Sequence, residues 1–185
     1  MITSLKKLGD KKLPAYKVAV GFGSCVDIFG DALPVFSATK VSPQAPFHHD
    51  RIDDDKELAE CFSYFFQQGA AGERYIASKD LFEELVENTY KGNLNKVALG
   101  GNAPVMANRF ALEQPEAQIL LAAQESHEFK EWMNPRVVFS GPVTDHADRH
   151  LILEYKKNEK FGDLQNHRDN RFIVHSDEHN PYTNF

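Results

Sequence analysis

The sequence predicts an α/β fold, because short apolar runs typical of buried strands alternate with segments of helical periodicity as far as about residue 142. Beyond that point strand-like runs follow one another with few helices between them. We therefore expect two layers, a βα main part and then part of an antiparallel or mixed cover. With 42% hydrophobic residues among 185, the chain has enough apolar side chains for a core.

The strands are predicted from brief apolar, β-branched runs. The first, Tyr16–Phe22, is stopped by glycines, and the segment from Gly23 to Asp27 is interpreted as a glycine-led turn or the end of a strand. Residues 31–56 are rich in Pro, Asp, His and Ser, so a loop with at most short strands is expected there. The remaining predicted strands are 96–99, 118–123, 136–140, 150–155 and 171–175.

The helices are predicted from periodicity and capping residues. From Lys56 to Gln68 the apolar positions recur at i, i+3, i+4, i+7 and i+8, and Gly69 ends the helix. Ser78 is expected to cap a second helix, and Asn102 a third that runs to about Glu113. A short fourth helix is predicted over residues 126–134.

Composition and charge exclude several classes of function. The net charge of −6 and the lack of a basic stripe argue against nucleic acid or an anionic membrane as a partner. Cys25 and Cys61 are expected to be reduced core thiols. No apolar run approaches the ~20 residues that span a bilayer. Residues 1–13 are predicted to be a flexible leader without a secretory signal, which places the chain as given in the cytoplasm.

Several residues could carry chemistry, and each also has a plain structural reading. Asp27 could accept hydrogen bonds from sugar hydroxyls, or only satisfy a local turn. Glu73 follows a stretch of small residues that permits close packing around a ligand, or is only an exposed residue of a loop. His150 begins a strand, where it could donate to a hydroxyl or simply lie at the strand edge. Arg171 could hold a phosphate, or form a surface ion pair. The turn Gly100, Gly101 and Asn102 lets backbone approach a ligand, or simply starts a helix.

No metal site is predicted from the sequence. His48, His49 and Asp50 precede an aspartate run at 53–55, which superficially suggests metal ligands. Adjacent histidines cannot easily share one ion on a regular element, and consecutive aspartates in a polar loop are usually solvated. The spacing also indicates no Ser–His–Asp or Cys–His nucleophile.

Five sequence segments, taken together, resemble the ADP-dependent glucokinases, in particular the animal-type branch. They occur in the order and at the spacing of that family. They are Val18–Asp27, Gly69–Arg74, Gly100–Asn108, His150–Tyr155 and Asn170–Ile173.

The resemblance implies a ribokinase-like fold, with an α/β/α three-layer main domain and a smaller β-containing lid, incomplete at its C-terminal side. Main-domain parts are expected at about 14–27 and 56–142, and lid parts at about 28–55 and 143–180. The implied activity is transfer of the β-phosphoryl group of ADP to O6 of glucose, with Mg²⁺ whose ligands lie mostly outside this chain. A monomer is expected, and for a longer form the endoplasmic reticulum.

The resemblance also implies roles for individual residues. Glucose hydroxyls would be held by Asp27, Glu73, His150 and the turn 100–102, and ADP phosphates by Arg171. The family's general base lies in a late Gly-x-Gly-Asp motif that does not occur in these 185 residues, so no catalytic residue is assigned and this chain alone is expected to be inactive.

The sequence departs from the family pattern at two further places. Gly23 stands where the family usually has Asn. The Gly-Pro expected after the strand near residue 120 is absent, although Gly141-Pro142 follows later. Two alternatives therefore stay open: a non-catalytic sugar- or partner-binding form, and an ADP-dependent phosphofructokinase-like kinase. The negative charge of Glu73 favours glucose over a phosphorylated sugar.

Overall fold

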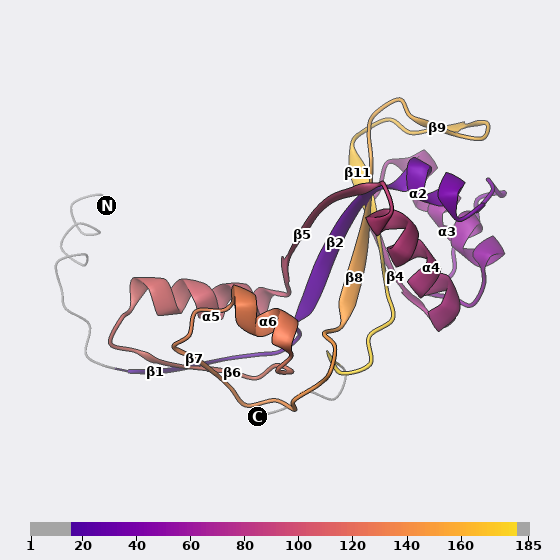
Figure 1. Ribbon diagram of the computed structural model, residues 1–185. Coiled ribbons are helices and arrows are strands. Elements are labelled where there is room, and N and C mark those ends of the chain that lie inside the picture. Colours follow the sequence, from indigo (N-terminus) through magenta and orange to yellow (C-terminus); the bar gives the residue numbers. More distant parts are fainter. Residues whose placement is uncertain (1–15, 181–185) are drawn as a thin grey trace, which may run out of the picture.

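The strands form two separate sheets and one small hairpin in the computed structural model, which describes residues 16–180 (Figure 1). The leader predicted at 1–13 lies outside the described residues. The smaller sheet is parallel and has the order β1-β6-β7. Its strands are β1 (Lys17–Val20), β6 (Gln118–Leu121) and β7 (Val137–Phe139).

The larger sheet has six strands in the order β3-β4-β11-β8-β2-β5. It is mixed, because β11 pairs antiparallel with β8, β2 pairs antiparallel with β5, and the other pairs are parallel. Its strands are β2 (Cys25–Asp31), β3 (Arg51–Ile52), β4 (Gly72–Ile76), β5 (Leu94–Gly100), β8 (Arg149–Tyr155) and β11 (Asn170–His175).

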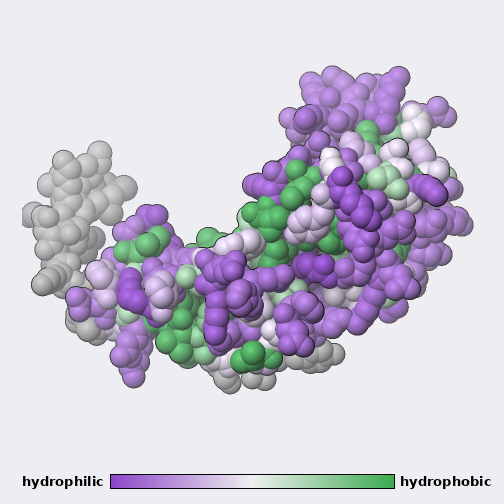
Figure 2. Space-filling model, viewed as in Figure 1, coloured by the Kyte–Doolittle hydropathy of each residue, from purple (hydrophilic) through white to green (hydrophobic). Residues whose placement is uncertain are grey.

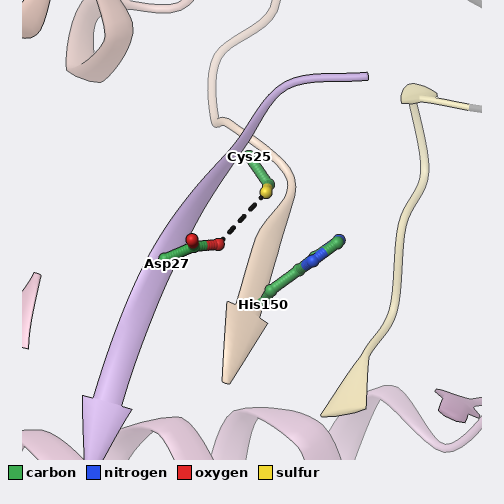
Figure 3. A group of neighbouring side chains, drawn as sticks. All are labelled: Cys25, Asp27 and His150. Carbon is green, nitrogen blue, oxygen red and sulfur yellow. Dashed lines mark hydrogen bonds between the residues drawn. The ribbon is translucent and has the colours of Figure 1, made fainter. Parts of the chain in front are cut away.

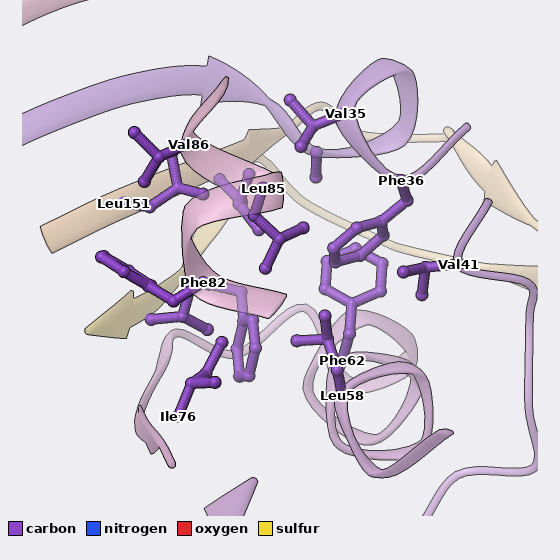
Figure 4. Packing of buried hydrophobic residues seen from close by; sticks show 14 of the residues in the cluster. Val35, Phe36, Val41, Leu58, Phe62, Ile76, Phe82, Leu85, Val86 and Leu151 are labelled. Carbon is purple, nitrogen blue, oxygen red and sulfur yellow. The ribbon is translucent and has the colours of Figure 1, made fainter. Parts of the chain in front are cut away.

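Three helices, α2 (Ala32–Ala38), α3 (Asp55–Gln68) and α4 (Lys79–Tyr90), cover one face of the larger sheet (Figure 1). Every second residue of a strand points to this face, and these side chains pack against the apolar side of each helix. Together they form the main core (Figure 4). Phe62 lies at the centre of this core and is fully buried. The hairpin of β9 (Lys160–Phe161) and β10 (Leu164–Gln165) adds Phe161 to the same cluster.

A second core lies between the smaller sheet and α5 (Asn102–Glu113). Ala103, Ala107 and Ala111 face the strands, and their small size allows the helix to approach closely. The short helix α6 (His127–Trp132) follows β6. The opposite face of this sheet carries no helix of the described residues, and Val138 on it is 60% exposed. The fold is thus mixed α/β, with a helical layer on one side of each sheet within residues 16–180.

The prediction for the segment from Gly23 to residue 56 was wrong in two places. Residues 25–31 form β2, a strand inside the larger sheet, and so Asp27 lies within this strand rather than at the end of the first one. Residues 32–38, predicted as loop, form α2. Pro34 suggested a loop, but proline is tolerated in the first turn of a helix.

The predicted cap of α5 also needs correction. Gly101, with φ 84°, is the N-cap residue, and Asn102 is the first residue of the helix. The other caps are confirmed, since the Ser78 hydroxyl accepts a hydrogen bond from Leu81 N and Gly69 ends α3 with φ 59°.

The larger sheet joins segments that the sequence assigned to different parts. β4 and β5 come from the stretch 56–142 expected in the main domain, yet they pair with strands from both stretches expected in the lid. The two sheets instead group residues 25–100 with 149–175, and 17–20 with 102–139. Within the described residues, no helix combines the length and apolar character needed to cross a membrane.

Candidate functional site

Polar side chains gather on the face of the larger sheet that is turned away from α2, α3 and α4, which we call the site face. Asp27 on β2 lies directly opposite His150 on β8, and His150 lies opposite His175 on β11. Figure 3 shows Asp27 and His150 projecting from neighbouring strands to the same side of the sheet. The sheet register therefore brings together residues far apart in the sequence. In the space-filling view, hydrophobic residues lie in the hollow between the two sheets (Figure 2).

His150 connects this row to two further carboxylates. Its Nε2 lies 3.0 Å from Asp177 Oδ1, and its Nδ1 lies 3.9 Å from Oε1 of Glu73 on β4. Burial lowers the pKa of His150, but the hydrogen bond to Asp177 and the charges of Asp177, Glu73 and Asp27 outweigh it, and the pKa is raised. The ring can therefore serve as a hydrogen-bond donor close to two acidic groups.

Asp27 is partly buried next to a buried thiol. Burial raises its pKa, and this effect outweighs the hydrogen bond that Cys25 Sγ donates to Asp27 Oδ1 over 3.3 Å (Figure 3) and the positive charge of His150. Burial, followed by the charge of Asp27, raises the pKa of Cys25 in turn, so this residue stays a thiol and not a nucleophilic thiolate. Of these two neighbouring groups, Asp27 is therefore the one that can bind hydroxyls.

The two glycines at 100 and 101 give this site its space. A Cβ at Gly100 would lie 2.2 Å from Asp27 Oδ1 and 2.6 Å from Cys25 Sγ, so only glycine lets β5 pass beside these side chains. A Cβ at Gly101 would lie 2.6 Å from the carbonyl oxygen of Gly23. The sequence analysis singled out these glycines because they could approach a ligand. In the structure Gly100 makes room for the Asp27 side chain, and Gly101 makes room for the backbone of Gly23. Asn102 is exposed at the start of α5.

We expect Gly100→Ala to lower the free energy of unfolding by about 1–3 kcal/mol, because the added methyl group displaces the Asp27 carboxylate or shifts β5. Urea denaturation followed by circular dichroism measures this change. Gly92→Ala is the matched control, since a Cβ there meets nothing within 4 Å. Equal stability of the two variants would show that Asp27 is not confined by β5.

A buried carboxylate that the sequence did not single out holds the segment after β11. Asp148 is 5% exposed and accepts hydrogen bonds from the backbone N–H groups of residues 178, 179 and 180, at 2.9, 3.0 and 2.7 Å. The side chain of Asn180 then bridges two parts of the site. Its Nδ2 donates to Asp177 Oδ2 over 2.9 Å, and its Oδ1 accepts from Ser24 N over 2.9 Å. This network fixes Asp177 next to His150.

Sequence reasoning therefore missed Asp148, His175 and Asp177 as parts of this site. The available signal was His175-Ser176-Asp177 directly after an apolar strand, a place where polar residues gather at a sheet end.

Arg171 lies on the site face but away from this cluster. Arg171 lies opposite Glu154, and Glu154 lies opposite Asp31. These three residues form one row across the strands near the other end of the sheet. From His175, Arg171 is four residues along β11, roughly 13 Å at the usual rise of a strand. Arg171, Asp31 and Glu154 line an open cavity of about 680 Å³ with Asn95 and Lys156. Arg171 is thus suited to a different part of a ligand than Asp27.

The residues at 48–55 have structural partners. His49 Nε2 lies 2.8 Å from Glu60 Oε2, and Arg51 Nε donates to Asp53 Oδ1 over 2.7 Å. Asp54 caps α3 by accepting from Glu57 N over 2.8 Å.

Mg²⁺ does not fit the ligand clusters on the site face. The two candidate clusters found among residues 16–180 are Cys25–Asp27–His150 and His150–His175–Asp177. Both contain nitrogen or sulfur donors, whereas Mg²⁺ selects oxygen ligands. No step is therefore derived through Mg²⁺ at these residues.

Comparison with known proteins gives a consistent result. Residues 16–185 match the family described as "ADP-specific Phosphofructokinase/Glucokinase conserved region". A "Probable ADP-dependent glucokinase" of Caenorhabditis elegans is 30% identical over 162 residues, and an "ADP-dependent glucokinase" of Bos taurus is 28% identical. Each match covers 87% of this chain and 32% of the relative, so the chain spans about a third of the length of these relatives.

Solved structures share the fold at low sequence identity. An ADP-dependent kinase in complex with fructose-6-phosphate and ADPβS superposes with a TM-score of 0.66 at 18% identity, covering 91% of this chain and 36% of that one. A hypothetical ADP-dependent phosphofructokinase from Pyrococcus horikoshii OT3 gives 0.61 at 13% identity, covering 88% and 41%.

Proposed function

The chain belongs to the ADP-specific phosphofructokinase/glucokinase family, and from this premise we propose that its site face binds the sugar acceptor of an ADP-dependent kinase. The proposed acceptor is glucose. In the reaction the β-phosphorus of ADP forms a bond to O6 of glucose, the bond from that phosphorus to the oxygen bridging to the α-phosphate breaks, and the O6 proton passes to a base. The products are glucose-6-phosphate and AMP.

The observation that carries the proposal is the juxtaposition of Asp27, His150 and Glu73. Asp27 and His150 are register partners on adjacent strands, and Glu73 Oε1 lies 3.9 Å from His150 Nδ1. Two carboxylates and an imidazole can together accept and donate hydrogen bonds to several hydroxyls of one sugar ring. The exposure of Glu73, whose side chain is 53% accessible, leaves it free to reach a ligand.

Glu73 also supports glucose over fructose-6-phosphate. A phosphorylated sugar placed at this site would bring a dianion close to Glu73 and Asp27. Like charges at short distance repel, so an uncharged sugar is favoured. We assign the phosphates of ADP to Arg171 near the other end of the sheet, because a guanidinium can bind phosphate in a bidentate manner. Arg171 and Lys156 must there offset the negative charges of Asp31, Glu154 and Asp169, which line the same cavity.

Phosphoryl transfer depends mainly on positioning and on neutralising charge. The family's base resides in a Gly-x-Gly-Asp motif that these 185 residues lack, and we place Mg²⁺ with that segment and with ADP. The chain therefore supplies sugar binding, and we propose that it forms no glucose-6-phosphate by itself and is monomeric.

We expect the 185-residue chain to bind glucose, and Asp27→Asn and Glu73→Gln each to weaken binding about tenfold or more, because each removes a charged hydrogen-bond acceptor. Isothermal titration calorimetry with glucose measures the dissociation constants, and a parallel titration with fructose-6-phosphate tests the acceptor. Asp31→Asn is the matched control, since Asp31 lies on the same strand and face as Asp27 but belongs to the row of residues near the other end of the sheet. Binding of glucose should be unchanged in this control.

Three outcomes would contradict the proposal. The first is tighter binding of fructose-6-phosphate than of glucose. The second is equal weakening by Asp27→Asn and Asp31→Asn. The third is no heat of binding with either sugar while circular dichroism shows a folded chain.

A further inference from the structure

Three side chains at the end of the site face form a compact cluster of metal-ligand types. His150 Nε2 lies 3.0 Å and 3.3 Å from the two carboxylate oxygens of Asp177, and His175 Nδ1 lies 3.3 Å from Asp177 Oδ1. One ligand atom from each residue lies within 4.8 Å of the others. The two imidazole rings are neighbours, with centroids 4.8 Å apart.

The cluster is largely shielded from water and contains a ring nitrogen whose contact with Asp177 is poorly directed. The side chains of His150, His175 and Asp177 are 18%, 21% and 11% exposed. His175 Nδ1 is buried and, although near Asp177, makes no well-directed hydrogen bond. A bound ion would give this ring nitrogen a well-directed partner and recover the free energy that a poorly satisfied buried polar atom costs.

These distances suit a small tetrahedral ion. With metal–ligand bonds of about 2.0–2.1 Å, neighbouring ligand atoms in a tetrahedron are separated by roughly 3.3–3.4 Å. The separations of Asp177 from both imidazole nitrogens are 3.0 and 3.3 Å. The ligand atoms of the two histidines lie within 4.8 Å of each other, so side-chain rotations that bring the rings closer would place both histidines and the carboxylate around one ion.

The surroundings supply the outer contacts that such sites need. Metal-bound histidines usually hydrogen-bond through their second ring nitrogen to a carboxylate. His150 Nδ1 faces Glu73 Oε1 at 3.9 Å, and a rotation of the half-exposed Glu73 side chain would bring the two atoms to hydrogen-bond distance. Asp177 is positioned by Asn180 Nδ2 at 2.9 Å. The backbone of the segment that follows is held by the buried Asp148.

We propose that His150, His175 and Asp177 bind a zinc-class divalent transition metal ion. Two imidazoles and one carboxylate select Zn²⁺ or Co²⁺ over Mg²⁺ and Ca²⁺, which prefer oxygen ligands. Three protein ligands leave a fourth position for water. This site shares His150 with the proposed sugar site, whereas His175 and Asp177 have no part in the proposed sugar binding.

The test is a Co²⁺ titration of the untagged 185-residue chain, without sugar or nucleotide, followed by visible absorption. Tetrahedral Co²⁺ absorbs far more strongly than octahedral Co²⁺, so the spectrum reports the coordination directly. We expect the intense tetrahedral spectrum, displacement of Co²⁺ by Zn²⁺ but not by Mg²⁺, and an upward shift of the melting temperature with Zn²⁺.

Variants locate the ion. His175→Ala and Asp177→Asn should each weaken Co²⁺ binding by at least about tenfold. His175→Gln serves if His175→Ala does not fold. His127→Ala, on α6 with a side chain 86% exposed, is the matched histidine control and should bind as the unmodified chain does.

A weak octahedral spectrum, or unchanged binding in folded His175→Gln, would overturn the proposal. Loss of the signal in His48→Ala rather than in the His175 variants would overturn it as well, since it would place the ion among the surface histidines. Because the titration contains no sugar, its failure leaves glucose binding a separate result.

Discussion

Replacing Phe62 with alanine is expected to lower the free energy of unfolding by about 3–5 kcal/mol, as is usual when a buried aromatic ring leaves a cavity. Phe62 is fully buried on α3, and its ring contacts five others. Centroid distances range from 4.6 Å for Phe36 to 5.9 Å for Phe172. These rings belong to α2, α3, β8, β9 and β11, so no single element can move to fill the space.

Urea denaturation followed by circular dichroism measures this loss, with Phe47→Ala as the matched control. Phe47 is 60% exposed, and removing its ring should change the stability by less than about 0.5 kcal/mol. Single domains are stable by only about 5–15 kcal/mol, so Phe62→Ala should leave the larger sheet close to unfolding. A loss below about 1 kcal/mol would show that the aromatic cluster does not hold the helices on the sheet.

Asp148→Ala is expected to lower the free energy of unfolding by about 3 kcal/mol, because it leaves three backbone N–H groups without their charged acceptor. The effect should also be local. Once residues 178–180 are released, Asn180 no longer holds Asp177, and the contact between Asp177 and His150 is lost. The site face should therefore be altered even where the variant remains folded.

Two measurements separate these effects. Thermal melting gives the loss of stability, and hydrogen exchange of the amides at 178–180 reports the local release. The exposed Asp163 provides the control, and Asp163→Ala should change neither. Amides at 178–180 that remain protected in Asp148→Ala would show that other contacts hold this segment.

Much of the fold could be predicted because its signals are local. The helix α3 follows from five apolar positions and a terminal glycine, and α4 from the cap at Ser78. Periodicity and capping act over a few residues, so they are visible in the sequence. The strand β2 was missed because Asp27 and Gly30 interrupt its apolar pattern. It is stabilised by β8 and β5 on its two sides, and such pairing is not encoded locally.

The sequence by itself determined the α/β class, the family and the identity of most candidate residues, because short motifs in a fixed order identify a family. Only the tertiary structure decided which of these residues meet. It joined Asp27 to His150, added His175 and Asp177, and placed Arg171 near the other end of the sheet. The reason is that sheet register connects strands far apart in the chain, and one residue of register decides which side chains share a face.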